Sequence, residues 1–485
     1  MQRLRYLSSI ISDVGDIFVY IAPSCCVPLL VALLYAEWNL LLPMAAVPAV
    51  FFAAGMLMRA LPRNERGTRL STAFCSVALF WFLCAMVSSI PFMLGLHMSF
   101  SDALFEGMAG WTGTAFTMMQ SLETAPHAIL FWRSYMQWIG GIGIIAFAIA
   151  LGSSTGLSRS KIFRTESRDE AFMPTVRNTG RALFRIYALL TFIAVGVILF
   201  TGLSLWESLN LALTTISTGG FSLHDEGILF YNSTSLELLL IPIMIVGALP
   251  FKLYYLVLEN RRWSLFGDDQ IKLFALILAF GVAVLTYDLV FFGNLPVVPA
   301  VKQSLFMTVS ALTTTGYQIT GLHSWAEVTL LFLTLITFIG GAAGSCAGGI
   351  KLNRVSLAAH ALVWWFQRLY ISGKVLVPFR IEGRIIPKAI AELETAKNML
   401  VIILSVLTVF VASLAILQFH LTTFTITEIV FTIVSAFSTC GINSGYVSAD
   451  MPVISKWIFI VTMWIGRLEV IPVVMLLMAL FRGEE

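Results

Sequence analysis

Ten apolar stretches run through this chain, and each approaches the length that a helix needs to cross a lipid bilayer. That length is about 20 residues. Hydrophobic residues fill 58% of the 485 positions and charged residues only 12%, which is more apolar surface than a water-soluble fold can bury. The predicted spans are residues 17–36, 39–60, 72–96, 127–151, 182–203, 235–257, 270–293, 327–350, 397–418 and 453–481. The sequence therefore predicts an all-α polytopic membrane protein.

Four short segments between these spans are similar to one another. They are Ala103–Thr117, Ser208–Ser222, Leu305–Gln318 and Val430–Asn443. Each lies between two predicted spans, so the chain reads as four repeats of helix, re-entrant segment and helix after two leading helices. The predicted divisions are a two-helix N-terminal extension at residues 1–66 and pore repeats at residues 67–155, 156–262, 263–370 and 371–485.

The four segments align on a closing residue, which is glycine in three of them. An apolar residue stands ten positions before each closing residue. In chain order these apolar residues are Phe105, Leu209, Phe306 and Phe431, and the closing residues are Ala115, Gly219, Gly316 and Gly441. The match predicts four equivalent short pore helices around a pseudo-four-fold pore.

The hydroxyl-rich ends of these segments are candidates for a cation filter. A re-entrant backbone at membrane depth must line a wet cavity or be buried in protein, because lipid cannot satisfy its polar groups. Glycine allows close approach to an ion, and four strands can supply rings of carbonyl oxygens that replace the water shell of potassium. One such segment alone reads as an ordinary turn, but four at matching places favour a filter. The predicted filter residues are Gly113, Thr114, Ala115, Ser217, Thr218, Gly219, Thr314, Thr315, Gly316, Thr439, Cys440 and Gly441.

The distribution of Lys and Arg predicts the orientation. These residues gather in the loops between repeats, around residues 156–181 and 351–396, so we expect those loops and both termini to be cytoplasmic. The other side carries acids such as Asp225 and Glu226. An acidic mouth would concentrate cations, but solvated surface acids are common, and both interpretations stay open. Asp13 and Asp16 precede the first apolar run and argue against a cleaved signal peptide.

Several other functions are disfavoured by the sequence. The net charge of +3 gives no reason to expect a nucleic-acid partner. The chain lacks a G-x-x-x-x-G-K-[ST] loop, so we expect no organic cofactor in it. Its six histidines are scattered without H-E-x-x-H, and its six cysteines show no C-x-x-C pairing, so we do not expect an enzyme. A secondary transporter of another fold usually has two inverted halves, whereas the four repeats here keep one orientation.

The motifs are similar to those of a known family, the Trk/Ktr/HKT superfamily of potassium transporters, and most nearly to bacterial and archaeal Trk membrane subunits. The resemblance covers almost the whole chain, including two N-terminal helices typical of Trk. It rests on the third and fourth re-entrant segments and on FEGMAGWTGTAFT (residues 105–117), QWIGGIGIIAFAIA (137–150), STGGFSLHD (217–225), FIGGAAGSCAGGIK (338–351) and GRLE (466–469).

This resemblance implies a potassium-conducting subunit of the cytoplasmic membrane, with four repeats around one potassium filter and a homodimer with one pore in each subunit. It also implies a cytosolic regulatory partner that binds a nucleotide such as ATP, ADP or NAD. The two basic loops are candidate docking surfaces for that partner, although they could equally serve only to set the topology. Weak coupling to protons or sodium stays open.

A gate is expected near residues 338–351. The glycines in this stretch cost about 1 kcal/mol each in a helix interior, so the eighth span should unwind there. In the family the corresponding segment blocks the pore below the filter, and the arginine that matches Arg467 lies against it. An arginine inside a span is a functional candidate, although Arg467 could also pair with Glu469 or reach the cytoplasmic surface. The candidate gate residues are Gly340, Gly341, Gly344, Ser345, Cys346, Gly348, Gly349 and Arg467.

The sequence departs from the family pattern at two places. Ala115 closes the first filter strand where other members have glycine, so either the strand shifts register toward Gly113 or a methyl group lies at the ring. In plant HKT members a small side chain at this position accompanies sodium permeation, which keeps a sodium-permeable transporter as the alternative. In the gate segment, Cys346 and Ala347 stand where the family more often has Thr and Gly.

Overall fold

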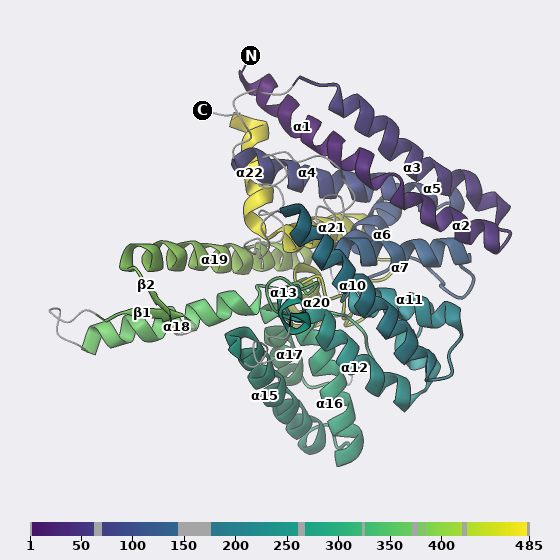
Figure 1. The fold of residues 1–485 in the computed structure, drawn as a ribbon. Helices are drawn as coiled ribbons and strands as arrows, with labels where there is room; N and C mark the ends of the chain where they lie inside the picture. Colours follow the sequence, from purple (N-terminus) through teal and green to yellow (C-terminus); the bar gives the residue numbers. More distant parts are fainter. Residues whose placement is uncertain are drawn as a thin grey trace.

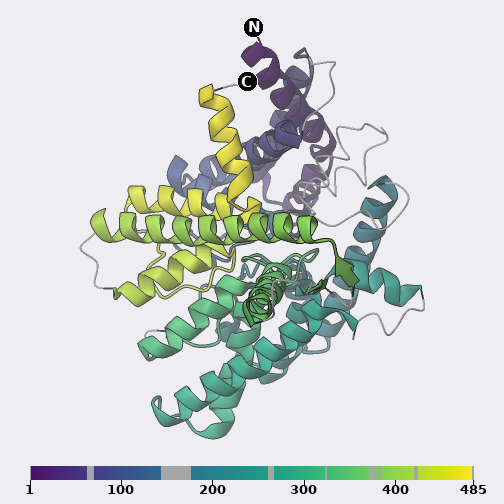
Figure 2. The same ribbon diagram turned by 90° about the vertical axis from the view of Figure 1, so that its left-hand side faces the viewer.

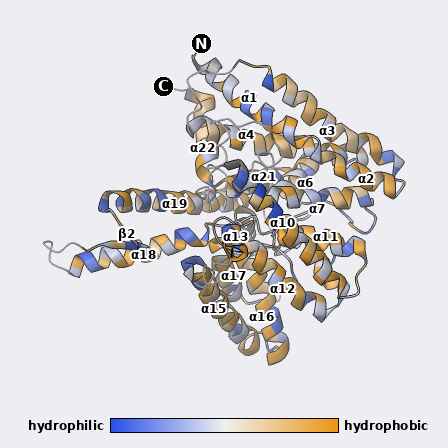
Figure 3. Cartoon of the chain, viewed as in Figure 1, coloured by the Kyte–Doolittle hydropathy of each residue, from blue (hydrophilic) through white to orange (hydrophobic). Residues whose placement is uncertain are grey.

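The computed structural model describes residues 2–62, 70–143, 176–259, 267–322, 325–370, 377–381, 384–419 and 424–482. The described residues form a bundle of helices and one two-stranded sheet (Figure 1). Apolar residues dominate most helices of the bundle (Figure 3). This is the predicted all-α membrane architecture, and the first basic loop, around residues 156–181, lies largely outside the described residues.

Two helical segments precede the repeats, as predicted. The first combines α1 (Gln2–Ile21), the 3-10 helix η1 (Ser24–Cys26) and α2 (Val27–Leu34), and the second is α3 (Trp38–Arg59). The first segment bends by 44° at its break. A β-carbon added to Gly15 would lie 2.8 Å from the carbonyl oxygen of Gly55, so α1 and α3 cross closely at these two glycines.

Four groups of helices follow, each with a leading helix, a short pore helix and a closing helix. The leading helices are α4 (Leu70–Ser88) with α5 (Ile90–Gly95), α10 (Val176–Leu199), α15 (Asp269–Phe291) and α19 (Lys388–Phe419). The pore helices are α6 (Phe100–Thr112), α11 (Leu205–Ile216), α16 (Val297–Leu312) and α20 (Ile426–Phe437). The closing helices are α7 (His127–Ile142), α12 (Thr234–Ala248) with α13 (Phe251–Leu258), α17 (Glu327–Ile339), and α21 (Val453–Leu468) with α22 (Val470–Arg482).

Local contacts fix the C-terminal end of every pore helix and the N-terminal end of three of them. The hydroxyl groups of Ser99, Ser204 and Thr425 cap three of the N-termini, and Glu207 and Glu428 complete capping boxes in two of them. At the other end each chain turns into the left-handed region within two residues of the last helical residue. Each pore helix therefore ends inside the bundle.

The closing helices are broken more often than the sequence predicted. Only the eighth span was expected to unwind, but α12 and α13 meet at 93° and α21 and α22 meet at 111°. The prediction of continuous spans at residues 235–257 and 453–481 is therefore wrong. Pro250 is the N-cap of α13, and Glu469, with a φ of 54°, separates α21 from α22. Proline and left-handed backbone both interrupt the helical hydrogen bonds.

Five continuous helices in the described part of the chain are long and apolar enough to cross a membrane, or up to eight spans if each bent pair is counted as one. The continuous ones are Trp38–Arg59, Ser71–Gly95, Asn178–Leu199, Asp269–Phe291 and Lys388–Gln418. The chain is thus a multi-pass membrane protein.

One helical arm projects from the bundle (Figures 1 and 2). It consists of α18 (Leu352–Tyr370), β1 (Phe379–Ile381), β2 (Arg384–Ile386) and the first part of α19, and β1 pairs antiparallel with β2. The arm has its own small core, in which Trp364 packs against Phe379 and donates a hydrogen bond to the carbonyl of Val377 at 2.9 Å. It contains the described part of the second basic loop, residues 351–396.

Candidate functional site

The ends of the four pore helices have the same backbone geometry. In the second, third and fourth repeats, the residue that follows the C-cap of the pore helix has a positive φ of 51°, 54° and 51°. In the first repeat the C-cap itself has a positive φ, of 73°. The N–H of the next residue donates to the carbonyl five residues earlier in every repeat. The positive-φ residues are Gly113, Thr218, Thr314 and Thr439, and the residues that follow are Thr114, Gly219, Thr315 and Cys440. The four segments are therefore equivalent, as predicted.

The structure corrects the alignment of the second repeat by one residue. Gly220, and not Gly219, is equivalent to Gly316 and Gly441. Ser217 is accordingly the C-cap of α11, the place that Thr313 occupies in α16. The segment carries two consecutive glycines, and the sequence pattern could not distinguish which of them closes the strand.

The four closing residues meet at one cavity. Ala115, Gly220, Gly316 and Gly441 all line a cavity of about 330 Å³, together with residues that follow each strand. β-carbons built on the three glycines would lie 2.9, 2.8 and 2.7 Å from the β-carbon of Ala115. The register shift considered for the first strand is not observed, and the methyl group of Ala115 lies at the point where the other three strands converge.

The glycines and Ala115 differ in backbone conformation at this level. Gly220, Gly316 and Gly441 have φ of 74°, 92° and 90°, whereas Ala115 lies outside the left-handed region. Its N–H donates to the carbonyl of Cys440 at 3.2 Å. The ring is thus asymmetric, with three left-handed glycines and one alanine.

Two glutamine side chains connect neighbouring strands, and the sequence analysis did not single them out. Gln137 on α7 donates to the carbonyl of Gly219 at 2.7 Å and accepts from the N–H of Phe221 at 3.0 Å. Gln318 exchanges two hydrogen bonds of 3.0 Å with the backbone of Asn443. These amides fix the second strand against α7 and join the third strand to the fourth. Gln318 lies two residues after Gly316, and this position in the sequence could have identified it as a residue of the site.

The cavity is partly acidic, because Asp225 and Glu226, two of the predicted acids, line it. Asp225 accepts from the backbone N–H of Leu122 at 2.6 Å, so it also holds the loop that follows the first strand. Asp102 pairs with Lys456 at 2.5 Å and so contributes less free negative charge.

The glycine-rich segment after α17 is non-helical, as predicted, and it contacts the ends of the third and fourth pore segments directly. α17 ends at Ile339, and α18 begins at Leu352. The N–H of Gly348 donates to the hydroxyl oxygen of Thr314 at 2.7 Å. A β-carbon at Gly348 would overlap the carbonyl of Ser438. The candidate gate residues Gly340, Gly341, Gly344, Ser345, Cys346, Gly348 and Gly349 all lie in this segment.

Arg467 joins this segment to the first repeat. Its guanidinium donates to the carbonyl of Cys346 at 3.1 Å and to the carbonyls of Gly140 and Gly141. The carboxylate of Glu469 forms an ion pair with Arg354. The expected proximity of Arg467 to the glycine-rich segment is therefore present.

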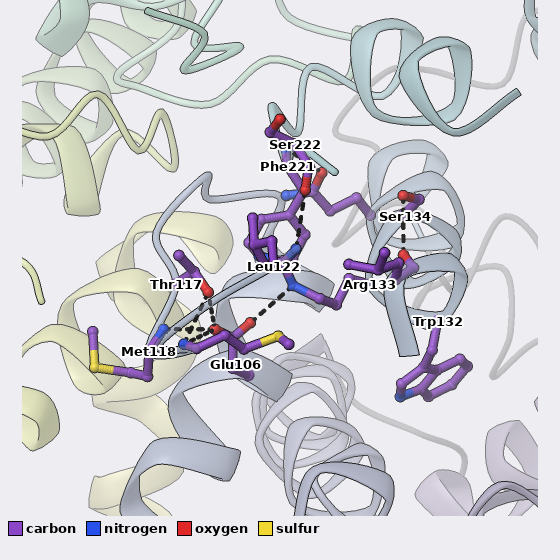
Figure 4. A network of polar contacts seen from close by, with 12 residues as sticks. Glu106, Thr117, Met118, Leu122, Trp132, Arg133, Ser134, Phe221 and Ser222 are labelled. Carbon is purple, nitrogen blue, oxygen red and sulfur yellow. Dashed lines mark hydrogen bonds and ion pairs between the residues drawn. The ribbon is translucent and has the colours of Figure 1, made fainter. Parts of the chain in front are cut away.

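A buried ion pair lies behind the first strand, and the sequence analysis missed it as well. Arg133 on α7 and Glu106 on α6 are 1% and 0% exposed, with Nε and Oε2 3.3 Å apart (Figure 4). A carboxylate inside a pore helix and an arginine inside a span were the signals that could have found it.

Four pore segments that end at one cavity, with a non-helical segment beneath them, define a four-repeat pore-loop membrane protein. The family profile TrkH, described as a cation transport protein, matches residues 45–482, so this chain belongs to the TrkH family.

Its relatives extend over the whole chain. It is 29% identical to an uncharacterized cation transporter of Methanocaldococcus jannaschii, over 98% of this chain and 96% of the relative. It is 27% identical to the Trk system potassium uptake protein TrkH of Escherichia coli, over 97% and 98%. The crystal structure of the potassium transporter TrkH from Vibrio parahaemolyticus superposes with a TM-score of 0.84 at 26% identity, covering 97% of this chain and 98% of that one.

Proposed function

We propose that this chain is a channel-like subunit for potassium uptake across the cytoplasmic membrane. The observation that carries the proposal is the convergence of four equivalent strand ends at one cavity. Four strands can surround a dehydrated cation with backbone oxygens at each level, which one re-entrant segment cannot do. The curated relatives named for potassium uptake support potassium as the transported ion.

The proposed filter consists of the three residues at the end of each pore helix, in the corrected register. Its residues are Gly113, Thr114, Ala115, Thr218, Gly219, Gly220, Thr314, Thr315, Gly316, Thr439, Cys440 and Gly441. Ser217 of the original prediction caps α11 and lies one step before them. Potassium is the transported substrate, and the chain needs no organic cofactor for this role.

The gate in this proposal is the segment between α17 and α18 together with Arg467. Gly348 lies against Thr314, so the segment reaches the inner level of the filter. Arg467 adds a positive charge that opposes a passing cation and holds the segment through the carbonyl of Cys346. Conduction then requires this segment to move away from the pore.

The proposed assembly is a homodimer in the lipid bilayer, with both termini cytoplasmic. The projecting arm of α18, β1, β2 and α19 carries basic residues and would offer a surface to a cytosolic nucleotide-binding subunit that senses ATP, ADP or NAD. A pull-down of that partner which survives neutralisation of the basic residues at 351–396 would argue against docking at the arm. Nucleic acid has no part in this function.

A sodium-permeable transporter of the same fold is the second candidate. The methyl group of Ala115 at the convergence of the strands favours it, because three left-handed glycines and one alanine make the ring that would select potassium asymmetric. Coupling of transport to protons or sodium belongs to the same alternative.

Growth rescue and flux measurements test the main proposal. Cells deficient in potassium uptake should grow at low potassium when they express the chain. The purified protein in liposomes should pass potassium down its gradient without a second ion. Absence of any potassium flux from correctly folded protein would refute the proposal.

A further inference from the structure

The ion pair of Glu106 and Arg133 is deeply buried, although a membrane fold has little need for charges at this depth. Both residues are at most 1% exposed. Removing two charges from water costs free energy that their attraction repays only with good geometry and further hydrogen bonds. The bonds made by the remaining atoms therefore indicate what the pair holds in place.

Glu106 holds the strand that leaves the first filter segment (Figure 4). Its Oε1 accepts hydrogen bonds from the hydroxyl of Thr117 and from the backbone N–H groups of Met118 at 2.6 Å and Met119 at 3.2 Å. Thr117 is only two residues past Ala115. The carboxylate therefore fixes the outer end of the strand that carries the asymmetric residue of the ring.

Arg133 holds the neighbouring strand at the same level. Its Nη1 donates to the carbonyl of Ser222 at 3.1 Å, and its guanidinium carbon lies 4.0 Å from the centre of the Phe221 ring. Phe221 directly follows Gly220, the closing residue of the second strand. The pair therefore forms a bridge from the first strand through α6 and α7 to the second strand.

The second repeat shows which residues occupy the positions equivalent to Glu106 and Arg133 when no ion pair is present. In the corrected register, Leu211 stands where Glu106 stands in the first repeat. A β-carbon on Gly247 would meet the carbonyl of Ile216, and one on Gly140 would meet the carbonyl of Trp111. Ile216 and Trp111 both lie four residues before their closing residue, so α12 aligns with α7 and Leu240 stands at the position of Arg133. Leu211 and Leu240 are both fully buried. An apolar pair thus suits the same site of the fold, and the charges belong to the repeat that carries Ala115.

Resting on the proposed function, we propose that Glu106 and Arg133 are positioning residues that fix the first filter strand against the second and thereby set the discrimination between potassium and sodium. The two charges cancel, so the pair acts through geometry and not through its field on the ion. Displacements of about 0.5 Å are enough to disturb a preorganised site. A looser first strand would let the Ala115 ring adapt to the smaller ion.

The test replaces the ion pair with the apolar pair of the second repeat. The double variant Glu106→Leu with Arg133→Leu leaves no unpaired buried charge, which is the main hazard of either single change. We expect the potassium-to-sodium flux ratio in liposomes to fall about fivefold, a size typical of coupling between a support and its site. The apparent KM for potassium should rise more than the maximal rate changes. Leu211→Met in the second repeat is the matched control and should keep the wild-type ratio.

Arg133→Lys keeps the fold testable if the double variant does not assemble. Lysine keeps the charge but lacks the planar guanidinium fork that spans Glu106 and Ser222 and stacks flat on Phe221, so a partial fall of about twofold in the ratio is expected. A wild-type ratio in a folded variant of either kind overturns the inference while potassium conduction by the parent chain still stands. If the parent chain conducts no potassium, the proposed function itself fails.

Discussion

Replacing Ala115 with glycine tests whether one methyl group limits cation discrimination. The other three closing residues are glycines in the left-handed region, and Ala115 is not. A β-carbon disfavours that region by about 1–2 kcal/mol. The Ala115→Gly strand can therefore adopt the backbone geometry of its three neighbours at little cost, and the methyl group at their point of convergence is removed.

The expected gain follows from one additional oxygen. If the first strand matches the others, its carbonyl can join the ring around a potassium ion. A hydrogen bond to a charged group contributes about 1.5–3 kcal/mol net, and we take the lower end for an ion–carbonyl contact in a wet pore. Since 1.4 kcal/mol corresponds to a tenfold change, the potassium-to-sodium flux ratio should rise about tenfold.

The assay compares potassium and sodium flux through the purified protein in liposomes under equal gradients. Ala115→Gly should also lower the free energy of unfolding by about 1 kcal/mol, because glycine loses more backbone entropy on folding. Ala326→Gly, at the exposed N-cap of α17, places the same substitution away from the four strands and should leave the ratio unchanged. An unchanged ratio in folded Ala115→Gly protein would refute the argument.

Three further variants test the gate and the packing. Arg467→Gln should raise potassium flux about tenfold, because it weakens charge-assisted bonds of about 1.5–3 kcal/mol to the gate segment; equal flux in liposomes would contradict the gate role. Thr314→Ala removes the acceptor of the Gly348 N–H, worth about 1 kcal/mol, and should raise flux about fivefold, whereas Thr314→Ser should not. Gly107→Ala should lower the free energy of unfolding by about 1–3 kcal/mol, since the new methyl would meet the Ala85 carbonyl. Gly196→Ala, which faces open space, should not lower the melting temperature in detergent.

Local pattern was enough to predict the helices and the equivalence of the pore segments. Apolar length locates a span because the bilayer fixes it, and the Thr-rich ends recur at matching places. The slip in the second repeat has a local cause too, since Gly219 and Gly220 are indistinguishable in a pattern that seeks one glycine. The backbone conformation of Gly220 identifies it as the closing residue, and an added β-carbon there would overlap the Thr315 carbonyl.

The bends and the cross-links between repeats could not be predicted in this way. The hydropathy of an apolar run is the same whether the helix continues or bends, so the 111° angle at Glu469 could not be predicted from hydropathy. Gln137 contacts the strand of the next repeat, more than 80 residues away. Such contacts depend on which elements lie side by side in the fold. The local periodicity of residue types in a single sequence does not report this.

The two unusual features of the first repeat act on the same strand, and this argues for treating them together. Ala115 closes the strand with a methyl group, and Glu106 fastens the same strand at Thr117. In the second repeat, glycine closes the strand and Leu211 stands at the position of Glu106. A selective ring depends on the spacing of its oxygens. The ring can therefore tolerate the methyl group of Ala115 on the first strand, provided that this strand is held in a fixed position. Independent effects of a gain of about tenfold and a loss of about fivefold would leave the triple variant about twofold above the wild-type ratio. On this argument the loss of the ion pair should cost less when residue 115 is glycine, so the triple variant should exceed that value. If the effects of the two changes simply add, the features are independent.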